Sequence, residues 1–170
     1  MCKRVLALIF NKRRVFLKSS FLTTAVILFS GSKLFGAISP LETLSLVQED
    51  LFPHAKEIGI KSAEYLLLIL DHSRITDEEK AFIRNGVQWL NEESLARFKK
   101  IYTKLSPAQR QEMLETISTE NWGARWIESM LTYILEATLG DPIYGANTKG
   151  AGWKWLHHTS GFPRPTKAYL

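Results

Sequence analysis

Between residues 40 and 140, hydrophobic residues recur at intervals of three and four, which is the spacing of one face of an α-helix. Two helix starts are marked by Thr76-Asp-Glu-Glu79 and Ser106-Pro-Ala-Gln109, in which a capping hydroxyl precedes Glu or Gln by three residues. Ser39 followed by Pro40 marks a further start, because proline is favoured at the first helical position. The pattern therefore predicts helices and few strands.

The expected helices cover approximately residues 40–52, 55–71, 77–91 and 94–105, then a segment that starts after Ser106, and residues 121–139. Pro53 should end the first helix and Gly140 the last one. The leucine-rich run 65–70 could be a buried strand on periodicity alone, but the longer helical pattern around it favours a buried helix. We expect an all-α fold: a single helical domain of five or six helices over residues 38–140, followed by an extended segment at 141–170.

The basic charge of the chain is concentrated at its N-terminus. Residues 1–37 contain seven of the 22 Lys and Arg residues and none of the 17 Asp and Glu residues, so the rest has 15 basic against 17 acidic residues. Net charge therefore gives no support for a nucleic-acid partner. The only cysteine, Cys2, also lies in this segment, so the remainder can form neither an intramolecular disulfide nor a thiolate metal site.

Residues 1–37 have the layout of an export signal: a basic leader, a short apolar stretch and a region of small residues. The leader resembles the twin-arginine signal, in which two arginines and any residue precede Phe-Leu-Lys. The matching residues are Arg13, Arg14, Phe16, Leu17 and Lys18. Cleavage is expected near Ala37, but retention as a membrane anchor stays open. The twin-arginine route exports folded proteins, so we expect that the chain either binds something in the cytoplasm or travels with a protein that does.

Several sequence patterns resemble catalytic or ligand-binding motifs, but each lacks the further residues that the chemistry requires. Gly145 and Gly150 have Walker spacing but lack the following Lys and Ser or Thr. The adjacent pair His157 and His158 has no further metal ligand at a suitable spacing. We expect Glu92-Glu93 to lie at a helix junction, and Asp71-His72-Ser73 to be neighbours without being a triad. We therefore assign no catalytic residue, metal ligand or cofactor-binding residue to this chain.

Residues 140–170 differ in composition from the helical body. They contain five of the ten glycines and three of the six prolines, together with several large aromatic residues. Aromatic side chains on a segment of this kind are typical of an interface anchor, because Trp and Tyr contribute strongly when they are buried against a partner. The alternative is a tail that folds back on its own helices.

The tail also resembles a known family. Asp141-Pro-Ile-Tyr-Gly-Ala-Asn147, Gly150-Ala-Gly-Trp153 and Gly161-Phe-Pro163 follow a long helix that contains tryptophan. This arrangement is similar to the gluconate 2-dehydrogenase subunit 3 family, whose members carry Asp-Pro-x-Tyr-Gly-Gly-Asn, Gly-Trp and Gly-Phe-Pro motifs. Ala146 stands where the family usually has glycine, which puts the geometry of that turn in question. The expected partner-binding residues are Asp141, Pro142, Tyr144, Gly145, Asn147, Gly150, Gly152, Trp153, Trp155 and Phe162.

The resemblance implies a non-catalytic small subunit that binds a large flavoprotein of the glucose-methanol-choline class and assists its maturation and export. FAD is then expected in the large subunit, and haem c in a possible cytochrome subunit. The complex would be periplasmic and associated with the inner membrane, after export by the twin-arginine translocase. Two other functions stay open: a small metal-dependent hydrolase that uses His157 and His158, and a structural protein held by an uncleaved anchor.

Overall fold

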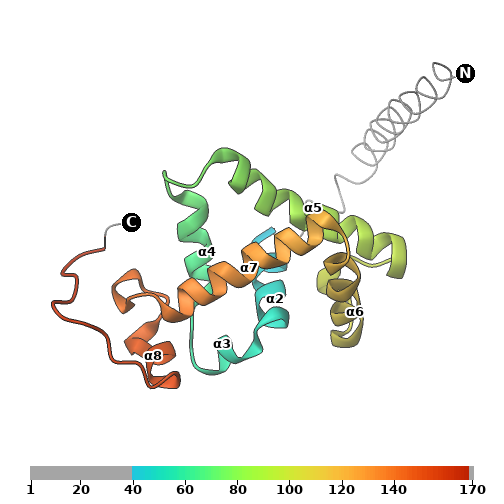
Figure 1. Ribbon diagram of the computed structural model, residues 1–170. Helices are drawn as coiled ribbons and strands as arrows, with labels where there is room; N and C mark the ends of the chain where they lie inside the picture. Colours follow the sequence, from blue (N-terminus) through green and yellow to red (C-terminus); the bar gives the residue numbers. More distant parts are fainter. Residues whose placement is uncertain (1–39, 169–170) are drawn as a thin grey trace, which may run out of the picture. The chain divides into compact units, whose positions relative to one another are not determined.

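The computed structural model describes residues 40–168 (Figure 1). The described part is all-α, as expected, and it has no strand. Its α-helices are α2 (Pro40–Leu51), α3 (Pro53–Glu57), α4 (Ser62–Asp71), α5 (Asp77–Phe98), α6 (Pro107–Ser118), α7 (Asn121–Leu139) and α8 (Ala151–Trp155). Short 3₁₀ helices are η1 (Tyr102–Lys104), η2 (Pro142–Tyr144) and η3 (Thr148–Gly150).

Helix α7 organises the domain. It packs against α4, α5 and α6, and its C-terminal end meets α8 (Figure 1). Trp126 and Met130 on α7 are fully buried, and the Nε1 of Trp126 donates a hydrogen bond to the carbonyl of Ile83 at 3.1 Å. The main core lies between α7 and α2, α4, α5 and α6, so the amphipathic faces predicted for these helices meet on one another.

The prediction of one continuous helix over residues 55–71 is wrong, because the helix is interrupted in the middle of this range. Helix α3 ends after Glu57, and α4 starts only at Ser62. The break is a Schellman motif: Ile60 N donates to Ala55 O at 2.8 Å, and Gly59 N donates to Lys56 O at 3.0 Å. Gly59 has a φ of +82°, which glycine adopts at little cost. The run 65–70 lies in α4, which confirms a helix there.

The prediction that a helix ends near Asn91 is also wrong. Helix α5 continues without interruption to Phe98 and ends where Lys99 adopts a left-handed conformation, with φ of +58°. The polar residues at the expected boundary are satisfied within the fold: Ser94 Oγ donates to Leu90 O at 2.7 Å, and Asn91 Oδ1 accepts from Tyr102 N at 3.0 Å. Residues 102–104 form η1 instead of the end of a separate helix.

The two predicted helix caps have different outcomes. Ser106 and Gln109 form a complete capping box, with hydrogen bonds of 3.3 and 3.0 Å in the two directions. Thr76 Oγ1 accepts from Glu79 N at 3.2 Å, but the Glu79 carboxylate accepts from the hydroxyl of Tyr133 on α7. The second cap therefore has only its first half, and its glutamate links α5 to α7.

Candidate partner interface

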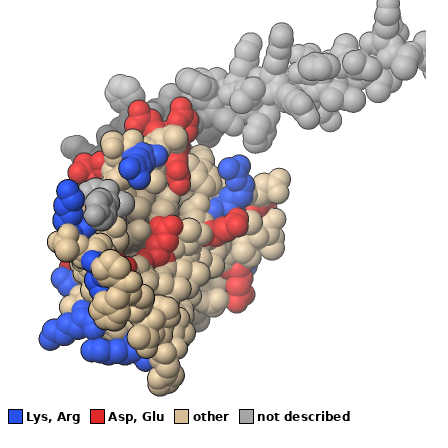
Figure 2. All heavy atoms as spheres, turned by 60° about the vertical axis from the view of Figure 1, so that its left-hand side comes forward, with Lys and Arg blue, Asp and Glu red and all other residues tan. Residues whose placement is uncertain are grey.

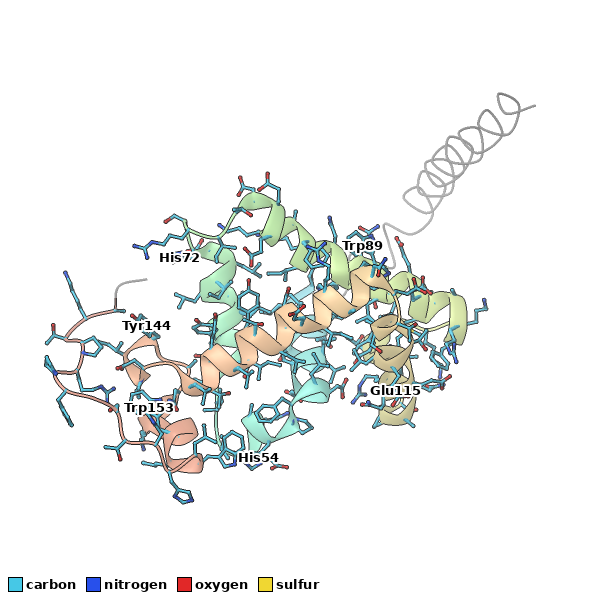
Figure 3. All side chains as sticks on the ribbon, in the orientation of Figure 1. His54, His72, Trp89, Glu115, Tyr144 and Trp153 are labelled. Atoms are coloured by element: carbon cyan, nitrogen blue, oxygen red, sulfur yellow. The ribbon has the colours of Figure 1, made fainter. Side chains whose placement is uncertain are left out.

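The segment after α7 is folded as far as Trp155 and is not extended there. It forms η2, η3 and α8, and α8 packs back on α7. Asp141 caps η2, since its Oδ1 accepts from Ile143 N at 2.9 Å, and Pro142 occupies the first helical position. This part of the tail corresponds to the alternative in which it folds back on its own helices. Figure 3 shows Tyr144 and Trp153 on this folded segment.

The side chain of Asn147 holds the folded segment together. Its Nδ2 donates to Gly140 O at 2.9 Å, and its Oδ1 accepts from Gly152 N at 2.8 Å. The residue is buried, and it thus joins the end of α7 to the start of α8. Both backbone groups would lose their partner without this side chain.

Gly152 allows α8 to approach α7 closely. A Cβ atom built at this position would lie 1.9 Å from the carbonyl oxygen of Thr138, a distance that no side chain can adopt. Gly145 and Gly150 have a different role, because their φ values of +88° and +65° lie in the left-handed region. Ala146 has no positive φ, and its buried methyl group packs with Ile134 and Ala137. Alanine therefore fits the turn whose geometry was in question.

Asp141 also binds the distal end of the tail. Arg164 donates from Nη2 to Asp141 Oδ1 at 2.9 Å and from Nε to Oδ2 at 3.1 Å. The guanidinium group lies 4.4 Å from the centroid of the Trp153 ring, and Trp153 Nε1 donates to Leu139 O at 2.6 Å. The hydrogen bonds from Arg164, followed by the one from Ile143 N, lower the pKa of Asp141.

Two of the predicted aromatic residues remain accessible. Phe162 is 84% exposed, and Trp155 is 40% exposed while its ring contacts Phe52 and His54, at centroid distances of 5.8 and 5.0 Å. Figure 2 turns the tail side forward and shows uncharged atoms over much of the lower part of this face. Trp155 and Phe162 are therefore free to contact a partner, whereas Asp141, Asn147, Gly152 and Trp153 act within the tail.

A second exposed apolar feature lies on α7. Leu131, Leu135 and Leu139 follow one another at four-residue spacing, and all three are exposed. Helical periodicity alone does not distinguish Leu131 and Leu135 from the buried residues of this helix. They are exposed because α7 has neighbours on only part of its circumference.

A polar network around Asp50 could not be predicted from local sequence patterns. The Asp50 carboxylate on α2 accepts from Arg110 Nε at 2.7 Å, from Arg110 Nη2 at 2.9 Å and from the Tyr102 hydroxyl at 2.7 Å. Burial, followed by the hydrogen bond to Asp50, raises the pKa of Tyr102. The network joins α2 to η1 and α6; Tyr102 is fully buried, and the side chains of Asp50 and Arg110 are each 15% exposed.

The catalytic patterns do not assemble into a site. Glu92 and Glu93 lie within α5 rather than at a helix junction, and His72 Nδ1 accepts from Arg74 N at 3.0 Å. Figure 3 shows His54 and His72 in separate parts of the domain. His157 and His158 are exposed, and no group of three His, Cys, Asp or Glu residues within 40–168 could hold a metal ion.

The predicted export signal, with Arg13, Arg14, Phe16, Leu17 and Lys18, lies outside the described residues. In the described part of the chain, every helix is too short or too polar to span a bilayer. The described residues 40–168 form a compact unit that includes the folded tail.

The comparisons with known proteins give one match. A sequence model of the family described as gluconate 2-dehydrogenase subunit 3 matches residues 40–161, which include the helical body and the tail motifs as far as Gly161. Neither the curated proteins nor the solved structures gave a significant match. Since the match covers more than half of the sequence, the chain belongs to the gluconate 2-dehydrogenase subunit 3 family.

Proposed function

We propose that this protein is the non-catalytic small subunit of a periplasmic, flavin-dependent sugar or sugar-acid dehydrogenase. It binds a large flavoprotein of the glucose-methanol-choline class in the cytoplasm, assists its maturation and supplies its export signal. The large subunit holds FAD and performs the oxidation. Where the complex includes a cytochrome c subunit, that subunit passes the electrons to the respiratory chain. The complex stays at the periplasmic side of the inner membrane.

The family match is the observation that carries this proposal, because the family is named as a dehydrogenase subunit. Two further observations support it. The Arg13-Arg14 motif is of a kind that directs export of folded proteins. The tail is held by Asn147 and Arg164 in a defined conformation that leaves Trp155 and Phe162 accessible, and a preorganised segment loses less conformational entropy on binding.

The export role can be tested by changing the twin-arginine motif. In a strain that makes both subunits, Arg13→Lys with Arg14→Lys should leave the flavoprotein in the cytoplasm together with this subunit. The matched control is Lys3→Arg with Arg4→Lys, which changes two basic residues outside the motif. Export of the flavoprotein should be normal in the control, and unchanged export in the first variant would contradict the proposal.

The binding role can be tested separately by affinity purification of this subunit from its native cells. We expect a larger, yellow protein whose absorbance spectrum is that of a flavin. The His157→Ala, His158→Ala double variant should co-purify with the same protein and the same dehydrogenase activity, since the two histidines have no role in this function. A purified subunit that carries stoichiometric metal and hydrolyses esters or amides would favour the metal-dependent hydrolase instead.

A further inference from the structure

The charges of the domain are divided unequally between its helical body and its tail. Residues 40–140 contain 11 Lys and Arg residues against 16 Asp and Glu residues, whereas residues 142–168 contain four basic residues and no acidic one. Asp141, directly before that range, is already paired with Arg164. The tail therefore presents a basic surface on an acidic domain.

Two lysines close to Trp155 in the sequence have no acidic partner. Lys154 directly precedes Trp155 in α8, and Lys149 lies in η3, two residues before α8 begins. Both lysines are exposed, and neither forms an ion pair within residues 40–168. Figure 2 shows basic side chains at the lower left of the tail-side face, beside uncharged atoms. The charges of the two lysines are therefore available to an acidic group outside the domain.

The backbone conformation of Lys149 is a second, independent sign that its side chain has a role. Its φ of +56° and ψ of +23° lie in the left-handed region, which is strained for a residue with a Cβ and easily adopted by glycine. The following residue, Gly150, is also left-handed and is a glycine. Lysine thus occupies a position that suits glycine, and conformations of this kind are concentrated at functional sites.

Trp155 and Leu156 provide an apolar centre beside these charges. They are 40% and 49% exposed. The Trp155 ring contacts the rings of Phe52 and His54, so it is held in position before a partner arrives. A fixed, accessible aromatic side chain with charged residues beside it is typical of a binding hot spot, in which the aromatic group becomes buried and the charges stay at the rim.

A protein surface fits this arrangement better than a lipid bilayer does. A segment that lies in a membrane surface buries the continuous apolar face of an amphipathic helix. Helix α8 has only five residues, and two of them, Gly152 and Trp153, contact Thr138 and Leu139 of α7. The surface that complements the tail is therefore a protein surface with carboxylates around an apolar depression.

We propose that Lys149 and Lys154 form a basic rim beside Trp155 and bind an acidic surface of the flavoprotein partner. Trp155 and Leu156 enter an apolar depression of that surface, and the two ammonium groups pair with carboxylates at its edge. The inference rests on the proposed function for the identity of the partner. The rim charges act mainly on the rate of association, because exposed ion pairs add little to the affinity of the final complex.

The first experiment measures the association rate constant of the purified subunit with the purified flavoprotein at two ionic strengths. Lys149→Glu with Lys154→Glu should lower this rate constant about tenfold in about 20 mM NaCl. The difference should shrink to less than about threefold in about 500 mM NaCl, where salt screens the charges. Lys99→Glu with Lys100→Glu, at exposed positions after α5, is the matched control: it changes the net charge equally and should leave the rate constant within about twofold of the wild type.

The second experiment separates binding from folding. Lys149→Gly removes the charge and relieves the left-handed backbone, so the Tm of the free subunit should not fall, while the association rate constant at low ionic strength should fall about threefold. Lys99 has a similar left-handed conformation, with φ of +58°, so Lys99→Gly is the matched control and should change neither rate constant nor Tm. A lower Tm or an unchanged rate constant in Lys149→Gly would show that this lysine serves the fold and not the interface.

Two further measurements test other occupants of the same surface. Vesicles of phosphatidylglycerol test a membrane, and sedimentation equilibrium tests a second copy of this chain, whose acidic body is a possible charge partner. We expect the purified subunit to bind no vesicles and to be a monomer. Vesicle binding or self-association that is lost in Lys149→Glu with Lys154→Glu would assign the surface to that occupant and overturn the proposal.

Failure of this proposal differs from failure of the proposed function. If the wild-type subunit does not bind the flavoprotein at either ionic strength, the proposed function is wrong, and so is the assignment of the acidic surface to that partner. If the wild type and Lys149→Glu with Lys154→Glu associate at the same rate at low ionic strength, the proposed function stands and the role of the basic rim is wrong.

Discussion

Arg164 binds Asp141 through two hydrogen bonds of 2.9 and 3.1 Å, although 23 positions separate the two residues in the sequence. The same guanidinium group covers the Trp153 ring, so one arginine holds both the start of the tail and its aromatic centre. Bidentate pairs of this kind add geometric specificity as well as attraction. The interaction fixes the path of residues 157–163, which includes the exposed Phe162.

Asp141→Asn should loosen the distal tail and leave the helical body intact. The neutral amide cannot accept both guanidinium hydrogen bonds, so residues 157–168 should become sensitive to protease while the Tm changes little. Glu112→Gln, which removes a charge from the exposed Arg97–Glu112 pair, is the control and should leave the tail resistant. Equal protease resistance of the tail in wild type and Asp141→Asn would show that the ion pair does not hold it.

The ion pair between Asp141 and Arg164 also predicts that the stability of the folded tail depends on pH. Because the hydrogen bonds from Arg164 lower the pKa of Asp141 below its ordinary value of 3.8, the pair stabilises the tail fully above that pH. The contribution is then lost as the pH falls from 3.8 through the lower pKa of the folded state. We expect the NMR signal of the Arg164 Nε–H group to show this transition in the wild type, at pH values below 3.8. Asp141→Asn has no carboxylate at this position and should not show it.

Gly152→Ala should destabilise the docking of α8 on α7. The new methyl group would lie 1.9 Å from Thr138 O, so the helices must separate, at a cost of about 2 kcal/mol in the free energy of unfolding. Gly161→Ala is the matched control, because a Cβ there meets nothing within 4 Å, and its effect should stay within about 0.5 kcal/mol. Chemical denaturation of the two variants measures the difference, and equal stabilities would contradict the packing described for α8.

The hydrogen-bond network around Asp50 predicts that two substitutions lower the free energy of unfolding by different amounts. Tyr102→Phe removes one hydrogen bond and leaves Asp50 paired with Arg110, so it should cost about 1 kcal/mol in the free energy of unfolding. Arg110→Met leaves the carboxylate, whose side chain is only 15% exposed, without its cation and should cost about 3 kcal/mol. Urea denaturation would test this order, and a greater loss in Tyr102→Phe would show that the hydroxyl, rather than the ion pair, dominates.

Local sequence signals predicted those parts of the fold that depend on neighbouring residues. Pro53 and Gly140 marked the ends of α2 and α7, and Ser106 with Gln109 marked the start of α6. The continuation of α5 was missed because the backbone of Tyr102, eleven residues further on, satisfies Asn91. Tertiary contacts of this kind override local preference.

The candidate site could be predicted only in part, for the same reason. Composition and motif resemblance identified the tail as the unusual segment. They did not show that Asn147 would join Gly140 to Gly152, because that role depends on the angle at which α8 returns to α7.

Phe162→Ala should separate partner binding from stability. The side chain is 84% exposed, so its loss should change the free energy of unfolding by less than about 0.5 kcal/mol. If Phe162 is an anchor for the flavoprotein, the same change should weaken the complex by about 2 kcal/mol or more. Leu67→Ala, which removes an exposed apolar side chain from α4, is the control and should affect neither property.

Trp153→Ala should instead lower both the stability of the subunit and its binding to the flavoprotein, because the Trp153 ring supports Arg164 and its Nε1 donates to Leu139 O. Normal binding by Phe162→Ala would indicate that the partner contacts Trp155 or the exposed leucines of α7 instead of the distal tail.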